Sequence, residues 1–245
     1  MIPQDFPAPQ AGTHPSGMFL QVRPLGLVEY EPTFRAMQAF TEARTDATAD
    51  ELWVCQHPPV FTLGLAGDPA HLLQRSNIPL VQVDRGGQIT YHGPGQIVVY
   101  PLVNLPRLGL KVREYVALLE DAIILSLAQA GVPGAQRKPN APGVYLPKGG
   151  ALAKIAALGI KVRKGCTYHG LALNVDMDLA PFQQINPCGY AGLETIDLRS
   201  IGVKISLDEM QILLVKNCSE ALARQQQAVI MGTPGTTPTT SPAGV

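Results

Sequence analysis

Apolar side chains recur at helical spacing in the middle of the chain. Four of them follow one another at steps of three or four residues: Val116, Leu119, Ile123 and Leu127. Such steps place side chains on one face of a helix, so the pattern predicts a helix over residues 113–130. Gly131 and then Pro133 follow directly, and both residue types end helices.

Two further helices are predicted, one on each side of this segment. Residues 33–47 form the first. The second begins at Ser206, because a serine followed three residues later by a glutamate, here Glu209, is the signature of a capping box. We expect this last helix to run to about Gln225.

Segments rich in β-branched and aliphatic residues lie between the helices and predict strands. Six are expected, over residues 52–55, 80–84, 96–103, 143–146, 152–162 and 167–175. Residues 163–165 join the last two as a hairpin, whose glycine suits a positive φ. Because consecutive strands with a tight turn argue against a purely parallel sheet, we expect an α/β (α+β) fold with a mixed β-sheet and flanking helices on one side.

The two ends of the chain differ in composition from its middle. Prolines crowd residues 1–17, and residues 232–245 hold proline, threonine and glycine without periodic apolar positions. Such segments bury too little apolar surface to offset the entropy of ordering, so we expect both to be disordered around one folded domain at residues 18–231. Within that domain, the proline- and glycine-rich residues 132–150 predict a long loop.

Composition narrows the class of protein. The chain has 245 residues, 46% of them apolar, which is enough for a substantial core. Nineteen basic and nineteen acidic residues cancel, so no net charge attracts nucleic acid or an anionic membrane. No apolar run reaches the ~18 residues of a membrane span. The four cysteines form no C-x-x-C pair, so we expect a soluble, cytoplasmic protein with reduced thiols.

The first candidate for chemistry is the glycine-rich segment 84–96, DRGGQITYHGPGQ. Glycines beside a strand let the backbone approach a ligand closely, and Arg85 and His92 bracket the run with polar groups. The spacing is neither that of a dinucleotide fingerprint nor that of a phosphate-binding loop. The same residues are consistent with a glycine-rich hairpin that holds a satisfied histidine.

The second candidate is Lys154, in the strand predicted over residues 152–162. Strict alternation places its side chain on the face of four apolar residues, Ala156, Leu158, Ile160 and Val162. A lysine on an apolar face is costly unless its ammonium is paired or its pKa is depressed. The alternative is an edge-strand lysine whose ammonium reaches water.

The third candidate is Cys188, between Pro187 and Gly189. These neighbours predict a turn, whereas Cys55 and Cys218 occupy the regular apolar positions typical of structural cysteines. A turn thiol is reactive when a cation lowers its pKa, and inert otherwise. Together the three candidates supply a thiol, an amine and a glycine-lined pocket, which are the parts of an acyl transferase that works through a thioester. No motif for a metal site or a serine nucleophile is present.

At these segments the sequence resembles the lipoyl(octanoyl) transferase family of lipoate biosynthesis. The matching stretches are RGGQITYHGPGQ (85–96), APGVY (141–145), KIAALGI (154–160), GCTYHGLALNV (165–175) and INPCGY (185–190). The resemblance covers roughly residues 50–215. It implies the mixed α/β core shared with lipoate–protein ligases and the catalytic module of biotin–protein ligases, in a single catalytic domain.

The resemblance also implies roles for individual residues. Cys188 would carry the acyl group as a thioester, and Lys154 would lower the pKa of that thiol. The acyl chain would be bound by Arg85, Gly86, Gly87, Gln88, Ile89, Thr90, Tyr91 and His92, by Ala157, Leu158 and Gly159, and by Gly170, Leu171 and Ala172. His92 and His169 would position the substrate and set the polarity of the pocket rather than act as bases.

The implied reaction moves an octanoyl group from the phosphopantetheine thioester of acyl carrier protein to a lysine of a lipoyl domain. Lipoyl domains of 2-oxoacid dehydrogenase complexes and the glycine cleavage H protein are the expected acceptors. Because the donor is already activated, neither ATP nor a metal nor another cofactor is expected. A basic patch would meet the acidic carrier protein, with candidates Arg107, Lys111, Arg113, Arg137, Lys138, Lys148, Lys161, Arg163 and Lys164.

Three features leave alternatives open. Asn140 stands where the family commonly has aspartate, and residues 147–153 lengthen the loop before Lys154. Cys166 is a second thiol near the predicted site, expected to pack or line the pocket rather than compete with Cys188. The alternative functions are an ATP-dependent lipoate– or octanoate–protein ligase of the same fold, an octanoyl amidotransferase, and an acyl-binding module without catalysis. The turn at Cys188 argues against the ligase.

Overall fold

A computed structural model describes residues 20–74, 76–186 and 192–232. In this part of the chain, seven strands form one sheet in the order β1-β2-β6-β10-β9-β8-β7. They are β1 (Leu20–Leu27), β2 (Asp50–Gln56), β6 (Gln96–Leu102), β7 (Gln136–Lys138), β8 (Ala141–Lys148), β9 (Ala151–Arg163) and β10 (Cys166–Asn174). β1 and β2 pair in parallel and the other neighbours are antiparallel, so the predicted mixed sheet is confirmed.

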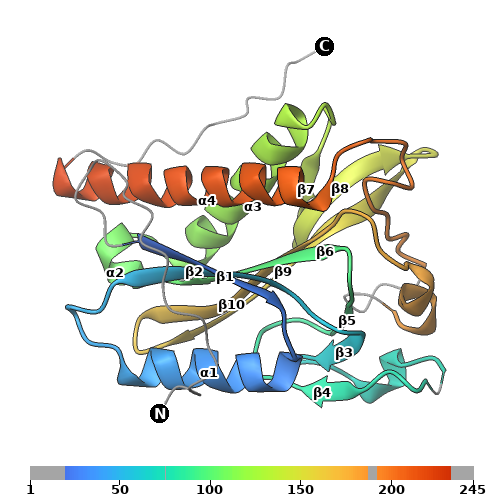
Figure 1. Cartoon of the computed structure of the whole chain (residues 1–245), viewed down its shortest axis with the longest axis horizontal. Helices are drawn as coiled ribbons and strands as arrows, with labels where there is room; N and C mark the ends of the chain where they lie inside the picture. The colour runs from blue at the N-terminus through green and yellow to red at the C-terminus, as the bar shows by residue number, and fades with distance from the viewer. Residues whose placement is uncertain (1–19, 75, 187–191, 233–245) are drawn as a thin grey trace.

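Helices cover both faces of this sheet (Figure 1). α3 (Val112–Gln129) and α4 (Leu207–Ile230) pack together on one face, with the short α2 (Leu105–Leu108) beside α4. α1 (Tyr30–Ala43) lies on the opposite face, against β10. The prediction of helices on one side is wrong, because β6 and β10 are buried at every position and strands of that kind need cover on both faces.

The two faces carry separate hydrophobic cores. On the α3–α4 face, Leu119 and Leu214 from the helices meet Val99 and Leu171 from the sheet. On the α1 face, smaller in extent, Met37 is the fully buried centre among aromatic side chains of the sheet, Trp53, Tyr100 and Tyr168.

A smaller sheet lies next to α1 (Figure 1). Its strands β4 (Leu80–Gln82), β3 (Val60–Leu63) and β5 (Ile89–His92) follow in that order across the sheet. Two 3₁₀ turns complete the described elements, η1 (Pro69–His71) and η2 (Ala180–Gln184). η2 packs on β5 through Phe182 and Tyr91. This small sheet carries the glycine-rich segment that leads from β4 into β5.

Tight turns join the strands around the predicted site. Lys164 and Gly165 have φ of 51° and 76° between β9 and β10, which confirms the predicted hairpin. The prediction of a long loop over 132–150 is wrong, because this stretch holds β7 and β8. Gly149 and Gly150, with φ of 58° and 82°, join β8 to β9, so residues 147–153 are a hairpin tip rather than an added loop. Asn140 turns between β7 and β8 at φ 59°, a conformation that asparagine and aspartate both tolerate.

Among the described residues, no helix combines the length and apolar character needed to cross a bilayer. Residues 1–17 and 233–245, predicted to be disordered, lie outside the described residues.

Candidate active site

A β-bulge in β9 decides where Lys154 points. Val144 and Tyr145 are consecutive on β8, but their partners on β9 are Ala156 and Lys154. Ile155 is therefore an extra residue without a partner on β8. One extra residue in a strand reverses the alternation of side chains from that point on.

The reversal places Lys154 on the opposite face from the apolar residues that follow it. Ala156, Leu158, Ile160 and Val162 pack on the α3–α4 face. Lys154 instead shares the α1 face with Ala157, whose partner Ala172 belongs to the core of that face. The prediction that put Lys154 among these apolar residues is wrong, because it assumed an uninterrupted alternation.

Lys154 is buried, with an exposed fraction of 4%. Its Nζ donates a hydrogen bond to the Pro142 carbonyl at 3.1 Å and lies 5.3 Å from the centre of the Tyr145 ring. Gly143 leaves room for this side chain, since a Cβ there would stand 2.5 Å from the Lys154 Cε. The alternative of a lysine whose ammonium reaches water does not fit this burial.

A pocket opens on the same α1 face of the sheet. Its floor consists of small residues that pair across β9 and β10: Ala157 with Ala172, and Gly159 with Gly170. Small side chains in neighbouring positions leave space above the sheet that larger ones would fill. Most of the residues predicted to bind the acyl chain meet here, namely Arg85, Gly87, Gln88, Ile89, Thr90, His92, Ala157, Leu158, Gly159, Gly170, Leu171 and Ala172, together with His169.

Two predicted binding residues do not line the pocket. The Gly86 amide donates to the Ile160 carbonyl at 3.4 Å and ties the glycine-rich segment to β9. Tyr91 alternates on β5 with the pocket residues Thr90 and His92, so its ring faces away and packs against Phe182.

Arg85 shapes the pocket from its rim. Its guanidinium donates hydrogen bonds of 2.8 to 3.0 Å to the carbonyls of Thr62, Gly86 and Gln88. Its side chain crosses Gly159, where a Cβ would stand 2.7 Å from the Arg85 Cδ. Arg85 therefore holds the glycine-rich segment over β9, and only glycine at position 159 permits this approach.

Hydrogen bonds determine the tautomer of His92. Asn174 donates from Nδ2 to the Ile196 carbonyl, so its Oδ1 accepts from Gln96 Nε2 at 2.9 Å. Gln96 Oε1 is then an acceptor, 2.7 Å from His92 Nδ1, which must carry the proton. Burial lowers the pKa of His92 to about 3, so the ring is neutral and its Nε2 is a hydrogen-bond acceptor.

His169 also lines the pocket, from an unusual backbone conformation. Its φ of 58° lies in the left-handed region, which is strained for a non-glycine residue inside a strand. The ring donates from Nε2 to Asp84 Oδ1 at 2.8 Å. Burial opposes the charge of Asp84, but hydrogen bonds from His169 and Tyr168 outweigh it and lower the pKa of Asp84 to about 2. Burial lowers the pKa of His169, so this ring too is neutral.

Four residues that sequence reasoning missed complete this region. Tyr30, Val98 and Tyr100 line the pocket, and Tyr30 stacks on His92 with ring centres 5.6 Å apart. His57 accepts from the Tyr100 hydroxyl at 2.7 Å, because its Nδ1 donates to a carbonyl. Burial lowers the pKa of His57 to about 4. No motif marks these residues in the sequence, and no group of three or more described His, Cys, Asp or Glu side chains could hold a metal ion.

Cys188 lies outside the described residues. The described residues on both sides of its segment are anchored. Before it, the Asn186 amide donates to the His71 carbonyl at 2.9 Å. After it, the Lys154 amide donates to the Glu194 carbonyl at 2.8 Å. The chain that follows the segment therefore pairs directly with the backbone of Lys154.

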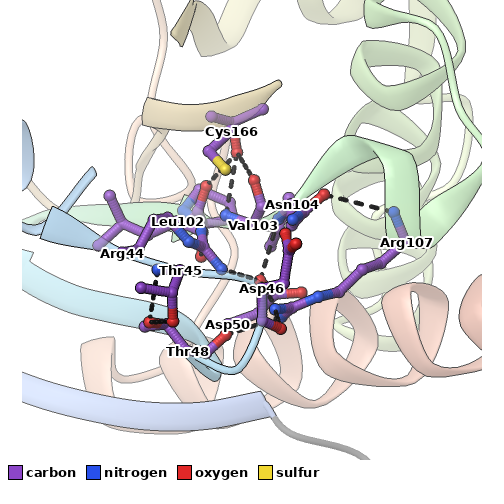
Figure 2. A network of polar contacts seen from close by, with 12 residues as sticks. Arg44, Thr45, Asp46, Thr48, Asp50, Leu102, Val103, Asn104, Arg107 and Cys166 are labelled. Atoms are coloured by element: carbon purple, nitrogen blue, oxygen red, sulfur yellow. Dashed lines mark hydrogen bonds and ion pairs between the residues drawn. The ribbon is translucent and has the colours of Figure 1, made fainter. Parts of the chain in front are cut away.

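Cys166 lies far from Lys154, in a separate polar cluster (Figure 2). It pairs with Arg163, nine residues beyond Lys154 on β9, which is roughly 30 Å of strand. Asp50 accepts hydrogen bonds there from Arg44 and Arg107. Burial raises the pKa of the Cys166 thiol. The expectation of Cys166 near the site is wrong, and its position is that of a packing residue.

Several of the basic residues proposed to meet a carrier protein are committed to ion pairs within the chain. Arg137 pairs with Glu120 and Asp121, and Lys148 with Glu194. Arg107 pairs with Asp50, and Arg163 and Lys164 pair with Glu42. These pairs reduce the charge that the residues present to a partner.

Known proteins resemble this chain in both sequence and fold. The model of the lipoyl protein ligase A/B catalytic domain matches residues 29–219. The octanoyltransferase of Bordetella petrii is 62% identical over 181 residues, which cover 73% of this chain and 85% of that protein. The octanoyltransferase of Aromatoleum aromaticum is 60% identical over 196 residues, 80% of this chain and 81% of that protein.

Solved structures share the fold at much lower identity. A bipartite lipoate protein ligase from Thermoplasma acidophilum has a TM-score of 0.64 at 17% identity, covering 84% of this chain and 89% of that chain. A biotin protein ligase from Aquifex aeolicus has a TM-score of 0.52 at 15% identity, covering 84% and 72%. These structures confirm the predicted fold class. The matches in sequence show that the chain belongs to the lipoyl protein ligase A/B catalytic-domain family and, within it, to the octanoyltransferases.

Proposed function

We propose that this enzyme takes an octanoyl group from the phosphopantetheine thioester of acyl carrier protein and passes it, through Cys188, to a lysine of a lipoyl domain. In the first step the Cys188 sulfur forms a bond to the acyl carbon and the bond to the pantetheine sulfur breaks. The departing pantetheine thiolate takes up the proton that Cys188 loses. In the second step the lysine nitrogen forms the amide bond, and the Cys188 thiolate leaves with a proton from that amine.

The observation that carries this proposal is the shared face of Lys154 and the pocket. The bulge turns a buried lysine toward the side of the sheet on which a largely apolar pocket lies. The segment that contains Cys188 is joined by described residues to the backbone of the same lysine. Thiol, amine and acyl site would then belong to one region of the molecule.

Lys154 would act on Cys188 electrostatically. An ammonium beside a thiol favours the thiolate, which is the nucleophile. The neutral amine is also able to take the thiol proton. Burial of Lys154 strengthens this interaction, because the local dielectric is low.

The pocket suits a medium acyl chain. Ala157, Ala172 and the glycine pair beside them form its floor, and Val98, also on the α1 face, adds apolar surface. At about 0.8 kcal/mol for each buried methylene, an octanoyl chain gains about 5 kcal/mol from leaving water. Burial lowers the pKa of His92 and of His169, which favours the neutral rings, and both would set the polarity of the pocket.

The expected partners follow from the reaction. The Thermoplasma acidophilum ligase belongs to a lipoylation system that includes an E2 lipoyl domain, which supports lipoyl domains as acceptors. A thioester donor already carries the activation that a ligase obtains from ATP, so we propose that neither ATP nor a metal takes part. Both protein substrates would meet the enzyme in the cytoplasm.

Mass spectrometry of the intact protein tests the thioester. After brief incubation with octanoyl-acyl carrier protein and no acceptor, we expect one octanoyl group on Cys188 that a lipoyl domain or hydroxylamine removes. Cys188→Ser should abolish this adduct, whereas Cys166→Ser should keep it. Cys166 is a matched control because it lies roughly 30 Å from Lys154 along the strands.

Other results would select the alternatives. If Cys188 stays unmodified while octanoate and ATP modify the lipoyl domain, the enzyme is a ligase. If neither donor supports transfer, the chain binds acyl groups without catalysis.

A further inference from the structure

We infer that Glu120 is a positioning residue for Lys154, to which it is connected through the single peptide group between Pro142 and Gly143. Its carboxylate accepts the N–H of this peptide, and the C=O of the same peptide accepts the Lys154 ammonium. The role deepens the proposed function, since it matters for transfer only if Lys154 acts on Cys188.

The geometry of this connection is complete among described residues. Glu120 projects from α3 and is buried, with an exposed fraction of 6%. Its Oε1 accepts from the Gly143 amide at 2.8 Å, and the Pro142 carbonyl accepts from Lys154 Nζ at 3.1 Å. The peptide group is planar, so fixing its N–H also fixes the direction of its C=O.

Charge reinforces this geometry. The peptide dipole points its positive N–H end at the carboxylate and its negative C=O end at the ammonium. Hydrogen bonds in such a chain polarise one another in a low dielectric. Glu120 also pairs with Arg137, Nε to Oε2 at 3.1 Å, which holds the carboxylate in place. The side chain of Glu120 is thus oriented by β7 and acts on β8.

Other charged and polar groups lie around Lys154, and their influence on it has to be distinguished from that of Glu120. Asp121 on α3 shares Arg137 with Glu120. The Tyr145 ring on β8 lies near the ammonium, and Lys138 on β7 contacts the same ring at 5.9 Å from its centre. Glu194 meets Lys154 through its backbone, while its carboxylate pairs with Lys148. Burial is the largest influence on the pKa of Glu120 and raises it, whereas the Gly143 amide, Arg137 and Lys154 lower it.

Direct titration of Lys154 provides the main test. In protein with ¹³C-labelled lysine, NMR follows the Lys154 signal with pH, and the Lys154→Arg variant assigns that signal. Glu120→Gln removes a negative charge, so the pKa of Lys154 should fall by roughly one unit. Asp121→Asn is the matched control, because its side chain is more exposed, at 38%, and has no contact with the Gly143 amide; it should shift the pKa far less.

Two further variants keep the test decisive. Arg137→Gln leaves Glu120 on the Gly143 amide and removes a positive charge, so the pKa of Lys154 should rise. This variant replaces Glu120→Gln as the test if Glu120→Gln does not fold. Glu120→Asp keeps the charge but is one methylene too short for the Gly143 amide. Its transfer should be slower at every pH, by about tenfold, without a displaced pH profile.

Glu120→Gln should instead move both limbs of the transfer pH profile to lower pH, because loss of a negative charge lowers the pKa of the ammonium and of the thiol alike. The inference is overturned if Glu120→Gln leaves the Lys154 titration unchanged or if Asp121→Asn shifts it equally. The NMR result does not depend on Cys188. A missing thioester together with the expected NMR shift would therefore reject the proposed function and keep the role of Glu120.

Discussion

Two buried polar clusters of this enzyme look alike in composition and differ in where their polar groups point. The Asp50 cluster holds Arg44, Asp50, Asn104, Arg107 and Cys166 (Figure 2). The pocket cluster holds Tyr30, Asp84, Arg85, His92 and His169. Each cluster contains an aspartate and at least one arginine, and each includes residues from strands. Both clusters are largely buried.

In the Asp50 cluster the opposite charges meet inside the protein. Asp50 Oδ1 accepts from both arginines and from the Asn104 amide, and so joins the end of α1 to β2 and α2. In the pocket cluster the histidines are neutral, and His92 keeps an acceptor nitrogen on a ring that lines the cavity. Burial alone therefore does not mark a functional site. The two clusters differ in whether opposite charges are paired within the protein or a hydrogen-bond acceptor lies on a ring that lines a cavity.

The largest expected effect is a loss of transfer when Lys154 is replaced, with little loss of stability. Lys154→Met should reduce transfer on the order of 10³-fold, because the thiol loses the amine that activates it. The free energy of unfolding should fall by only about 1 kcal/mol, because methionine keeps the packing of the lysine stem and loses the hydrogen bond to the Pro142 carbonyl. Single-turnover transfer and urea unfolding measure the two. Lys216→Met, an exposed lysine on α4, is the control and should keep activity.

Breaking the Asp50 cluster should give the reverse result. Asp50→Ala leaves Arg44 and Arg107 without their shared carboxylate, which should lower the free energy of unfolding by about 3 kcal/mol. Transfer by the folded enzyme should stay within about twofold of the parent, because the pocket lies elsewhere. Urea unfolding and transfer at a temperature below the transition test this. A large loss of transfer in the folded variant would contradict the separation of the two clusters.

A pH dependence of stability should belong to the histidines beside the pocket. Histidine titrates near pH 6.5 in an unfolded chain, whereas burial lowers the pKa of His92 to about 3 and that of His57 to about 4. Between pH 6.5 and 4 the unfolded chain binds protons that the folded chain does not. The free energy of unfolding should therefore decrease as the pH is lowered below 6.5, by about 1.4 kcal/mol per pH unit for each of the two histidines.

His92→Asn sharpens this measurement. Asparagine keeps a donor for Gln96 and does not titrate, so the slope of stability between pH 6.5 and 5 should decrease by the share of one histidine. Urea unfolding midpoints across that range give the slope. Equal slopes in both proteins would show that His92 does not titrate as its burial demands.

Most of the long elements were predicted and most of the short ones were not, although the eight-residue β1 was missed and the three-residue β4 was predicted. The helix around Ile123 and the hairpin of β9 and β10 follow from patterns within their own residues. β3, β5 and β7 have three or four residues each, too few for a period to appear, and they exist because a neighbouring strand pairs with them. Tyr30 and His57 were missed as well, because they lie in or beside the pocket only when α1 and the sheet pack against each other.

Local runs of specific residues were enough to identify the family, the strand that carries Lys154 and most of the residues that meet in the pocket. The direction in which Lys154 points follows only from tertiary packing. The bulge at Ile155 depends on pairing with β8, a separate stretch of chain, and the contact from Glu120 depends on α3 packing beneath that pair. Periodicity describes one strand at a time, whereas the face that a buried side chain occupies is set by its partners.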